Sequence, residues 1–464
     1  MSNSRQIDGF PNLVSLFFTR AAEGGDAPFL SRKQDRAWVS QSWREVAGQV
    51  AALADSLIKL GLNAGDRVVL VSENRPEWLI ADIGVMAAGC VTVPTYTTNT
   101  ERNHQHILDN SGARAVIVST AKLARTVMPA ALRSGIEFVI VMEDMRTAQQ
   151  GDVRLIDWAS LVQGGEDKIA EATARAATVR RGDLACLIYT SGTGGAPRGV
   201  RQHHGAILHN VEGAAAILDE DFGLADEVFL SFLPLSHAYE HTGGQYLPIG
   251  CGAQIYYAEG LEKLVSNIEE VRPTIMVVVP RLFEVIRARM LKAVEKQGKA
   301  ANFLLGQALK LGAKDYSKGL SLLDKPMNMV VNRMFRPKIS QRFGGRMKAM
   351  VAGGAPLNPE IGIFFHSIGL TLLQGYGQTE AGPVISCNRP KAGLKMDTVG
   401  PPLKNTEVRI AEDGEICVRG ELVMHGYWRN EAETARVLVD GWLLTGDIGH
   451  IDDQGRIVIT DRKK

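Results

Sequence analysis

The chain has 464 residues, of which 45% are hydrophobic, and its 52 Lys and Arg residues nearly balance its 51 Asp and Glu residues. Because a single domain typically has about 150 residues, this length predicts two or more packed units, and the composition excludes wholesale disorder. The formal net charge of +1 gives no overall field that would hold a polyanion, so we expect no nucleic-acid partner.

The five cysteines are spread along the chain without any Cys-x-x-Cys spacing, which argues against a disulfide framework or a cysteine zinc site and fits a reducing compartment. No apolar run approaches the ~20 residues that span a bilayer, and residues 1–18 lack the apolar core of a signal peptide. We therefore predict a cytoplasmic protein that is soluble or associated with the cytoplasmic face of a membrane.

The first third of the chain alternates helical and strand patterns. Hydrophobic residues in 43–60 recur every three or four positions, which predicts an amphipathic helix, and residues 67–72 then predict a buried strand. The alternation continues through predicted helices and strands at 78–88, 91–94, 104–111, 115–118 and 137–142. Continuous apolar strands separated by helices predict a parallel sheet that is covered on both faces.

Two further regions complete the predicted fold. A second series of strands predicts another α/β unit, at residues 184–189, 255–257, 274–279 and 348–351. After about residue 395, short apolar runs divided by Asp and Gly turns predict antiparallel β structure, at residues 408–410, 414–419 and 456–459. The predicted fold class is therefore α/β, with two stacked parallel-sheet subdomains at about 1–180 and 181–390 and a small distorted antiparallel β-barrel at about 395–460.

Charge is segregated along the chain. Residues 287–348 contain 15 Lys and Arg residues and three Asp and Glu residues, a net charge of +12, so the remainder of the chain carries −11. Two interpretations stay open at this point. The segment forms exposed helices with solvated basic faces, or it forms a surface for phosphate groups or anionic lipid.

The strongest local motif is Tyr-Thr-Ser-Gly-Thr-Gly-Gly-Ala-Pro-Arg-Gly at residues 189–199, directly after a predicted buried strand. Its glycines and hydroxyls can wrap a polyphosphate while its cation neutralises charge, which predicts a nucleotide site. The residues that we assign to phosphate binding are Thr190, Ser191, Gly192, Thr193, Gly194, Gly195 and Arg198. The segment matches neither the Walker A nor the G-x-G-x-x-G pattern, and taken alone it is also compatible with a flexible surface loop.

Further motifs make the chain similar to the AMP-forming adenylating superfamily, which includes acyl-CoA synthetases, luciferases and peptide-synthetase adenylation domains. The segment 353–357, Gly-Gly-Ala-Pro-Leu, resembles the strand end that lines the adenine pocket, and 373–380, Leu-Gln-Gly-Tyr-Gly-Gln-Thr-Glu, resembles the Tyr-Gly-x-Thr-Glu motif. The resemblance assigns adenine packing to Tyr376, the α-phosphate to Thr379 and magnesium to Glu380. It assigns further nucleotide contacts to Gly353, Gly354, Ala355, Gln374, Gly375 and Gly377.

The C-terminal motifs extend the resemblance. Asp447, in Trp-Leu-Leu-Thr-Gly-Asp, corresponds to the carboxylate that accepts both ribose hydroxyls, and Arg462 corresponds to a ribose contact at the start of a hinge whose pivot is Lys464. The chain stops at 461–464 directly after a predicted strand. The resemblance thus predicts a large N-terminal adenylation domain at 1–460 and the start of the hinge at 461–464, with the family's small C-terminal domain absent.

The phosphate motif departs from the family pattern at two positions. Gly194 stands where a second threonine is common, which removes one possible phosphate donor at a cost of about 0.5–1.5 kcal/mol. Arg198 stands where lysine is common, so the charge is kept but spread over a planar fork. Both changes are compatible with phosphate binding.

Several segments are similar to the long-chain fatty acid CoA ligases, namely 233–241, 270–274 followed by 279–284, and 461–464. This similarity implies a hydrocarbon tunnel behind the adenylate and places His237 near the carboxylate and the pantetheine entrance. The alternative is that His237 and His241 are hydrogen-bonded structural histidines. Residues 237–241 also spell His-x-x-Glu-His, the pattern of one class of zinc proteases, although flanking Pro and Gly residues argue against a long helix and no third ligand is evident.

The sequence predicts an ATP-dependent enzyme that activates a long-chain fatty acid to acyl-AMP and transfers it to CoA, with AMP and pyrophosphate as products. The resemblance implies that residues 1–464 by themselves bind these ligands but turn over poorly. The predicted cofactors are ATP, Mg²⁺ and CoA, with Thr190 and Glu380 at the metal and with Thr190, Arg198, His237, Thr379 and Glu380 as the catalytic set. Two alternatives stay open: an acyl-AMP ligase that passes the acyl group to a carrier protein, and a non-catalytic fragment that binds nucleotide and acyl group with little turnover. The resemblance also allows a homodimer, and the basic segment 287–348 allows peripheral contact with an anionic membrane.

Overall fold

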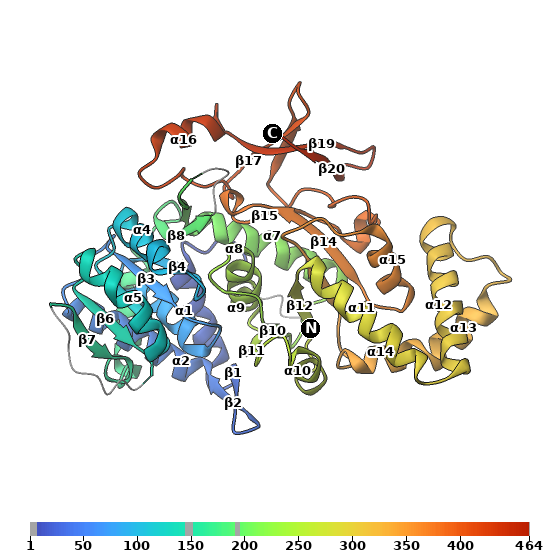
Figure 1. The fold of residues 1–464 in the computed structure, drawn as a ribbon, viewed down its shortest axis with the longest axis horizontal. Helices are drawn as coiled ribbons and strands as arrows, with labels where there is room; N and C mark the ends of the chain where they lie inside the picture. The colour runs from blue at the N-terminus through green and yellow to red at the C-terminus, as the bar shows by residue number, and fades with distance from the viewer. Residues whose placement is uncertain (1–6, 144–151, 191–194, 464) are drawn as a thin grey trace.

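The computed structural model describes residues 7–143, 152–190 and 195–463. Three sheets organise this part of the chain (Figure 1). Two large sheets rich in parallel strands lie side by side with helices packed around them, and a smaller antiparallel sheet lies across one end of both, as Figure 1 shows. The predicted α/β fold class is confirmed, and the predicted barrel is present as an open, half-barrel sheet.

The first sheet has seven strands in the order β7-β6-β5-β3-β4-β8-β9, all parallel except for the β8–β9 pair. The strands are β3 (Arg67–Val71), β4 (Val91–Thr95), β5 (Ala115–Val118), β6 (Phe138–Val141), β7 (Arg154–Asp157), β8 (Leu184–Thr190) and β9 (Arg198–His203). Their helices are α2 (Trp43–Lys59), α3 (Pro76–Ala87), α4 (Glu101–Ser111), α5 (Ala121–Arg133) and α6 (Ile169–Ala176). Local sequence sets the first of these helices, because Ser42 and Glu45 form a capping box at its N-terminus.

The second sheet has eight strands in the order β15-β14-β13-β12-β10-β11-β1-β2. The strands are β1 (Pro28–Gln34), β2 (Ala37–Ser42), β10 (Val228–Ser231), β11 (Gln254–Tyr257), β12 (Ile275–Val278), β13 (Ala349–Ala352), β14 (Leu372–Gly377) and β15 (Val384–Cys387). The helices around it include α1 (Leu13–Gly24), α7 (His204–Phe222), α10 (Leu264–Val271), α11 (Pro280–Glu295) and α15 (Pro359–Ser367).

Two strands join a different large sheet from the one that their position in the chain suggests. Strand β8, which we expected to open the second unit, pairs with β4 in the first sheet, and β1, from the N-terminal region, pairs with β11 in the second. Neighbour choice in a sheet depends on tertiary packing, which the period of a single strand does not encode. The predicted subdomain boundaries themselves stay a prediction.

The third sheet is formed by β16 (Glu407–Ile410), β17 (Glu415–Arg419), β18 (Leu438–Val439), β19 (Trp442–Ile451) and β20 (Ile457–Arg462), with α16 (Glu431–Val437) before β18. Residues 425–428, which precede α16, lie along β9. Backbone N–H groups of Trp428 and Arg201 donate to the carbonyls of Gly199 and Gly426 at 2.7 and 3.0 Å. These bonds attach the third sheet to the edge of the first.

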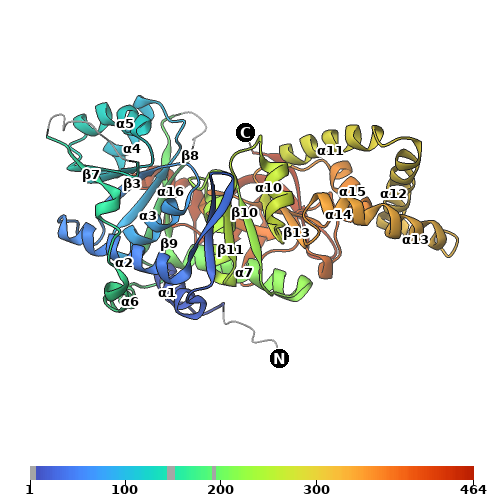
Figure 2. The same cartoon turned by 90° about the horizontal axis from the view of Figure 1, so that it is seen from below.

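The basic segment forms the helices at the far end of the molecule. Helix α12 (Lys299–Lys318), α13 (Lys325–Met334) and α14 (Arg336–Arg342) follow α11, and the α12–α13 pair projects away from the sheets in both views (Figures 1 and 2). No helix in the described ranges combines the length and hydropathy needed to cross a bilayer.

Two glycines of α12 allow a matched test of its packing. A Cβ at Gly312 would lie 2.3 Å from Cα of Ser367 in α15, whereas a Cβ at Gly306 would meet nothing within 4 Å. We expect Gly312→Ala to lower the free energy of unfolding by about 1–3 kcal/mol, because the helices must separate. Gly306→Ala should leave it unchanged or raise it by up to about 1 kcal/mol. Urea unfolding of both variants measures this difference, and equal effects would contradict the packing.

Candidate functional site

A cavity of about 570 Å³ lies where the third sheet faces the ends of strands from both large sheets. In parallel-sheet proteins, ligands bind outside the carboxyl ends of the strands. Eleven of the residues predicted from sequence line this cavity, namely Thr190, Arg198, His237, Gly353, Gly354, Gly375, Tyr376, Gly377, Thr379, Glu380 and Arg462. Five separate sequence motifs are therefore brought to one place.

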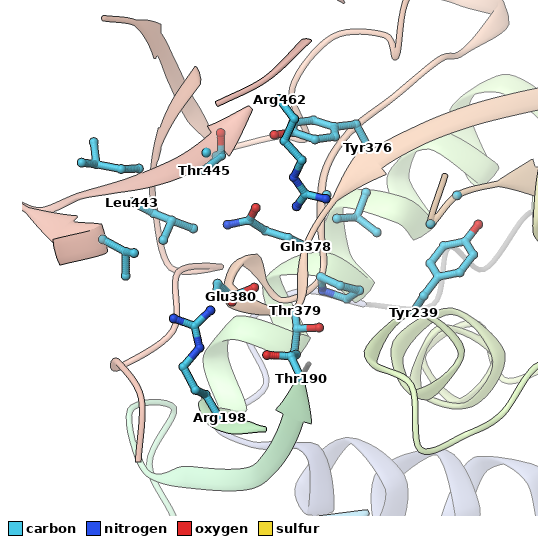
Figure 3. Close-up of a pocket in the computed structure, with 18 of the residues that line it drawn as sticks. Thr190, Arg198, Tyr239, Tyr376, Gln378, Thr379, Glu380, Leu443, Thr445 and Arg462 are labelled. Atoms are coloured by element: carbon cyan, nitrogen blue, oxygen red, sulfur yellow. The ribbon is translucent and has the colours of Figure 1, made fainter. Parts of the chain in front are cut away.

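The cavity has two ends that differ in chemistry. Figure 3 shows Thr190, Thr379, Glu380 and Arg198 gathered at one end, with Tyr376 and Arg462 at the other. Thr190 and Arg198 are Cα partners across the antiparallel β8–β9 pair, so the predicted phosphate loop is the connection of a hairpin. Residues 191–194 of this loop lie outside the described residues.

Arg198 has two contacts at the first end. Its Nη1 donates to Oε2 of Glu433 in α16 at 2.8 Å, and its guanidinium lies 4.6 Å from the ring centroid of Tyr427. Its Nε is buried and has no hydrogen-bond partner among the described residues. Its Nη2 donates to no described residue, so this part of the guanidinium fork is available to a ligand.

Glu380 and Thr379 follow β14 in a short 3₁₀ turn, Thr379–Ala381. The Tyr427 hydroxyl donates to Oε1 of Glu380 at 2.8 Å, and Nε2 of Gln202 donates to the Thr379 carbonyl at 2.7 Å. No described residue donates to Oε2 of Glu380. One free carboxylate oxygen together with phosphate oxygens is a donor set that suits Mg²⁺. The described residues contain no cluster of three His, Cys, Asp or Glu side chains that would hold a metal alone.

At the other end, the Tyr376 hydroxyl donates to Oδ2 of Asp447 at 2.7 Å, and Nε of Arg462 lies 3.4 Å from Oδ1 of the same carboxylate. Burial, followed by the nearby Asp447 charge, raises the pKa of Tyr376, so its hydroxyl stays a donor. An aromatic face beside a carboxylate and a guanidinium is suited to a purine and its ribose.

Close backbone approach explains two of the glycines. A Cβ on Gly353 would come within 2.7 Å of the Tyr239 ring, and a Cβ on Gly377 would come within 1.9 Å of the Pro383 carbonyl oxygen. Neither position has room for a larger residue without displacement of the cavity wall.

Four predicted residues lie outside the lining of this cavity. Ala355 follows the Gly353–Gly354 turn, Gln374 is buried in β14, and Asp447 contacts the cavity through Tyr376 and Arg462. Gly195 lines an adjoining cavity of about 510 Å³ that shares Arg198 and Glu433 with the first.

Residues 237–241 do not form a metal site. His241 Nε2 lies 2.8 Å from Oδ2 of buried Asp82, and Ser231 donates to Oε1 of Glu240 at 2.6 Å, whereas His237 lies in the cavity. The zinc alternative is wrong because the three side chains have different partners. The interpretation of His241 as a structural histidine is confirmed. Desolvation lowers the pKa of His237, which favours the neutral imidazole.

Sequence reasoning missed several residues of the cavity. Tyr239, Tyr427, Glu433 and Arg436 line it, and none belongs to a motif that the sequence singled out for nucleotide binding. Tyr239 stands inside the 233–241 segment and could have been noted there. Tyr427 and Glu433 reach the cavity only because the third sheet docks on β9, which no local pattern indicates.

Comparison with known proteins agrees with this geometry. The AMP-binding enzyme family matches residues 17–428, and the chain belongs to this family. It is 34% identical over 460 residues to long-chain-fatty-acid–CoA ligase FadD15 of Mycobacterium tuberculosis, covering 98% of this chain and 74% of that protein. It is 30% identical over 484 residues to long chain acyl-CoA synthetase 1 of Arabidopsis thaliana, covering 99% and 71%.

Solved structures share the fold at lower identity. The N-terminal domain of FACL13 from Mycobacterium tuberculosis matches with a TM-score of 0.69 at 21% identity, covering 97% of this chain and 100% of that chain. The anthranilate CoA ligase AuaEII in complex with anthranoyl-AMP matches with a TM-score of 0.70 at 19% identity, covering 97% and 77%.

Glu240, which is buried next to the cavity-lining Tyr239, provides a test of the electrostatics in this region. Burial raises its pKa to about 8, more than the Ser231 hydrogen bond lowers it, whereas an unfolded chain has a value of about 4.3. Between these values the folded protein keeps a proton that the unfolded chain has released, so this group's contribution to stability is lost as pH rises through the window. The Glu240→Gln variant has no titrating group at this position. Between pH 5 and pH 8, its free energy of unfolding should therefore rise relative to that of the wild type by a few kcal/mol, to an order of magnitude.

Urea unfolding at pH 5 and pH 8 measures this gain. The control is Glu407→Gln, at an exposed carboxylate paired with Arg419, whose pKa is lowered by that partner and which therefore titrates below the window. Parallel pH profiles for wild type and Glu240→Gln would show that Glu240 is ionised in the folded protein.

Proposed function

We propose that this chain catalyses the ATP-dependent activation of a long-chain fatty acid and its transfer to CoA. The fatty acid carboxylate attacks the α-phosphorus of ATP, the bond to the β-phosphate breaks, and pyrophosphate leaves. The CoA thiol then attacks the acyl carbon, loses its proton and releases AMP. One observation carries this proposal: hydroxyl, cationic, carboxylate and aromatic groups line the same cavity, in a chain that is 34% identical to a long-chain-fatty-acid–CoA ligase.

The proposed roles follow the chemistry of each group. Thr190 and Thr379 donate to phosphate oxygens, Arg198 neutralises charge on the leaving pyrophosphate, and Glu380 with Thr190 holds Mg²⁺ bound mainly through phosphate. The metal, when bound, supplies charge stabilisation as phosphoryl oxygens become more negative. The proposal also places adenine on Tyr376, ribose at Asp447 and Arg462, and the acyl carboxylate near His237. Such a reaction needs alignment and charge stabilisation more than a nucleophilic side chain.

The direct test incubates the protein with ATP, Mg²⁺ and palmitate and measures pyrophosphate and AMP, then adds CoA and measures loss of free thiol. Acid-dependent pyrophosphate release followed by thioester formation supports the proposal. Pyrophosphate release without thioester formation would favour transfer to a carrier protein, and nucleotide binding without either product would favour a non-catalytic role.

We expect Glu380→Gln to lower kcat/KM for Mg²⁺-dependent activation by about 10²-fold or more, because the amide keeps the shape but loses the charge that pairs with the metal. Pyrophosphate release at saturating Mg²⁺ measures the effect. A variant within threefold of the wild type would show that Glu380 has no part in metal binding.

We further propose that the α12–α13 projection docks on an anionic lipid surface. Leu322 and Leu323, in the connection between these helices, are 77% and 92% exposed, and exposed Lys318 and Lys325 stand on either side of the connection. Apolar side chains at the tip of a basic projection suit insertion between acyl chains with the cations at the head groups. A lipid surface also fits the proposed long-chain fatty acid substrate, which partitions into bilayers.

Vesicle co-sedimentation tests the docking surface. Wild-type protein should bind phosphatidylglycerol vesicles at low salt and bind less as salt rises, and the double variant Leu322→Ser/Leu323→Ser should bind at least about tenfold more weakly, since each buried leucine contributes about 1.5–3 kcal/mol. Leu261→Ser, at a leucine that is 65% exposed elsewhere on the molecule, is the control. Equal loss in both variants, or no binding by the wild type, would overturn this proposal.

A further inference from the structure

Tyr427 occupies an unusual position between the two charged groups at the phosphate end of the cavity. It lies just before α16, its side chain is 5% exposed, and it forms an isolated β-bridge with Val200 of β9. Its neighbours in sequence belong to the third sheet region, but its side chain also contacts Arg198 of the first sheet and Glu380, which follows β14 of the second. It therefore joins parts of the site that are far apart along the chain.

The side chain of Tyr427 touches both groups at once. Its hydroxyl donates to Oε1 of Glu380 at 2.8 Å, while its ring lies 4.6 Å from the guanidinium carbon of Arg198. A hydrogen bond to a carboxylate restricts the carboxylate's orientation, and an aromatic face attracts and orients a guanidinium. One side chain thus sets the direction of a carboxylate and of a cation.

Backbone hydrogen bonds of the residues around Tyr427 hold the same two parts of the site, at Glu380 and next to Arg198. The Met424 N–H donates to the Glu380 carbonyl at 2.9 Å, and the Trp428 N–H donates to the Gly199 carbonyl, next to Arg198, at 2.7 Å. The Tyr427 N–H donates to Oγ1 of Thr434 in α16 at 2.9 Å. Because the main chain of this segment is held on both sides, the ring and hydroxyl have a defined place.

The charges around Tyr427 also match this arrangement. Glu433 holds Nη1 of Arg198, whereas Nε of Arg198 is buried without a partner in the described residues. The guanidinium is therefore oriented by the ring and by one carboxylate, and its Nη2, which donates to no described residue, is left for an incoming phosphate.

We propose that Tyr427 is a positioning residue that couples the metal carboxylate Glu380 to the phosphate cation Arg198. This inference rests on the proposed function for the roles of those two groups. Tyr427 itself touches neither substrate nor metal in this proposal. Its hydroxyl sets Glu380 for Mg²⁺, and its ring sets Arg198 for phosphate, so the two effects are separable by substitution.

Two substitutions at Tyr427 separate its effect on Glu380 from its effect on Arg198. Tyr427→Phe keeps the ring and loses the hydrogen bond, and it should raise the half-saturating Mg²⁺ concentration by about tenfold, the value of a hydrogen bond to a charged group, while kcat at saturating Mg²⁺ stays within about threefold. Tyr427→Leu loses both contacts and should in addition weaken ATP binding without Mg²⁺ by about threefold to thirtyfold, the range of a cation–π contact. Tyr257→Phe is the control, since the Tyr257 hydroxyl is buried without a partner among the described residues.

Calorimetric titration with ATP, with and without Mg²⁺, provides a readout that needs no turnover. Tyr427→Phe should bind Mg·ATP more weakly than the wild type and metal-free ATP equally well, and thermal unfolding confirms that each variant is folded. If Tyr427→Leu does not fold, Tyr427→Phe alone still tests the inference. Identical Mg·ATP binding by Tyr427→Phe, Tyr257→Phe and the wild type would overturn the inference. An inactive wild type that shows the predicted binding differences would refute the proposed reaction and leave the coupling supported.

Discussion

The site depends on the edge of strand β9. Because β9 ends the first sheet, its outer backbone groups are free to pair with another segment, and residues 425–428 occupy that edge through N–H groups of Arg201, His425 and Trp428. This pairing holds the third sheet over the strand ends of both large sheets. Without it, Tyr427 and Glu433 would lie far from Arg198 and the cavity would lack one wall.

A second contact joins the two large α/β units below the cavity. Asp82 of α3 is fully buried, and its Oδ2 accepts hydrogen bonds from Nε2 of Gln245 and the hydroxyl of Tyr246, both at 2.7 Å, in addition to its contact with His241. A buried carboxylate is costly unless such partners are present. The network therefore constrains how α3 packs against residues 241–246, which follow the cavity-lining His237 and Tyr239 in the chain.

The cavity holds many charges that are already paired. Arg198 pairs with Glu433, Arg462 lies beside Asp447, and Lys463 donates to Glu415 at 2.7 Å. A phosphate ligand would therefore meet cations that already have a carboxylate partner and would use only the donors that remain. This arrangement limits binding of unrelated anions, because only a group of matching geometry reaches those donors.

The sequence by itself determined the elements of this protein and the location of its chemistry along the chain. Helices and strands such as α2 and β3 follow from hydrophobic period and capping, which are local, and the hydroxyls and carboxylates at 190, 379, 380 and 447 stand in motifs that can be read from the sequence. Only the tertiary structure decided that β1 joins the second sheet and β8 the first. It also decided that Glu433 pairs with Arg198 across 235 positions and that Tyr427 lies between Arg198 and Glu380. Such partners are chosen by sheet pairing and side-chain packing over long sequence distances, and no local period records that choice.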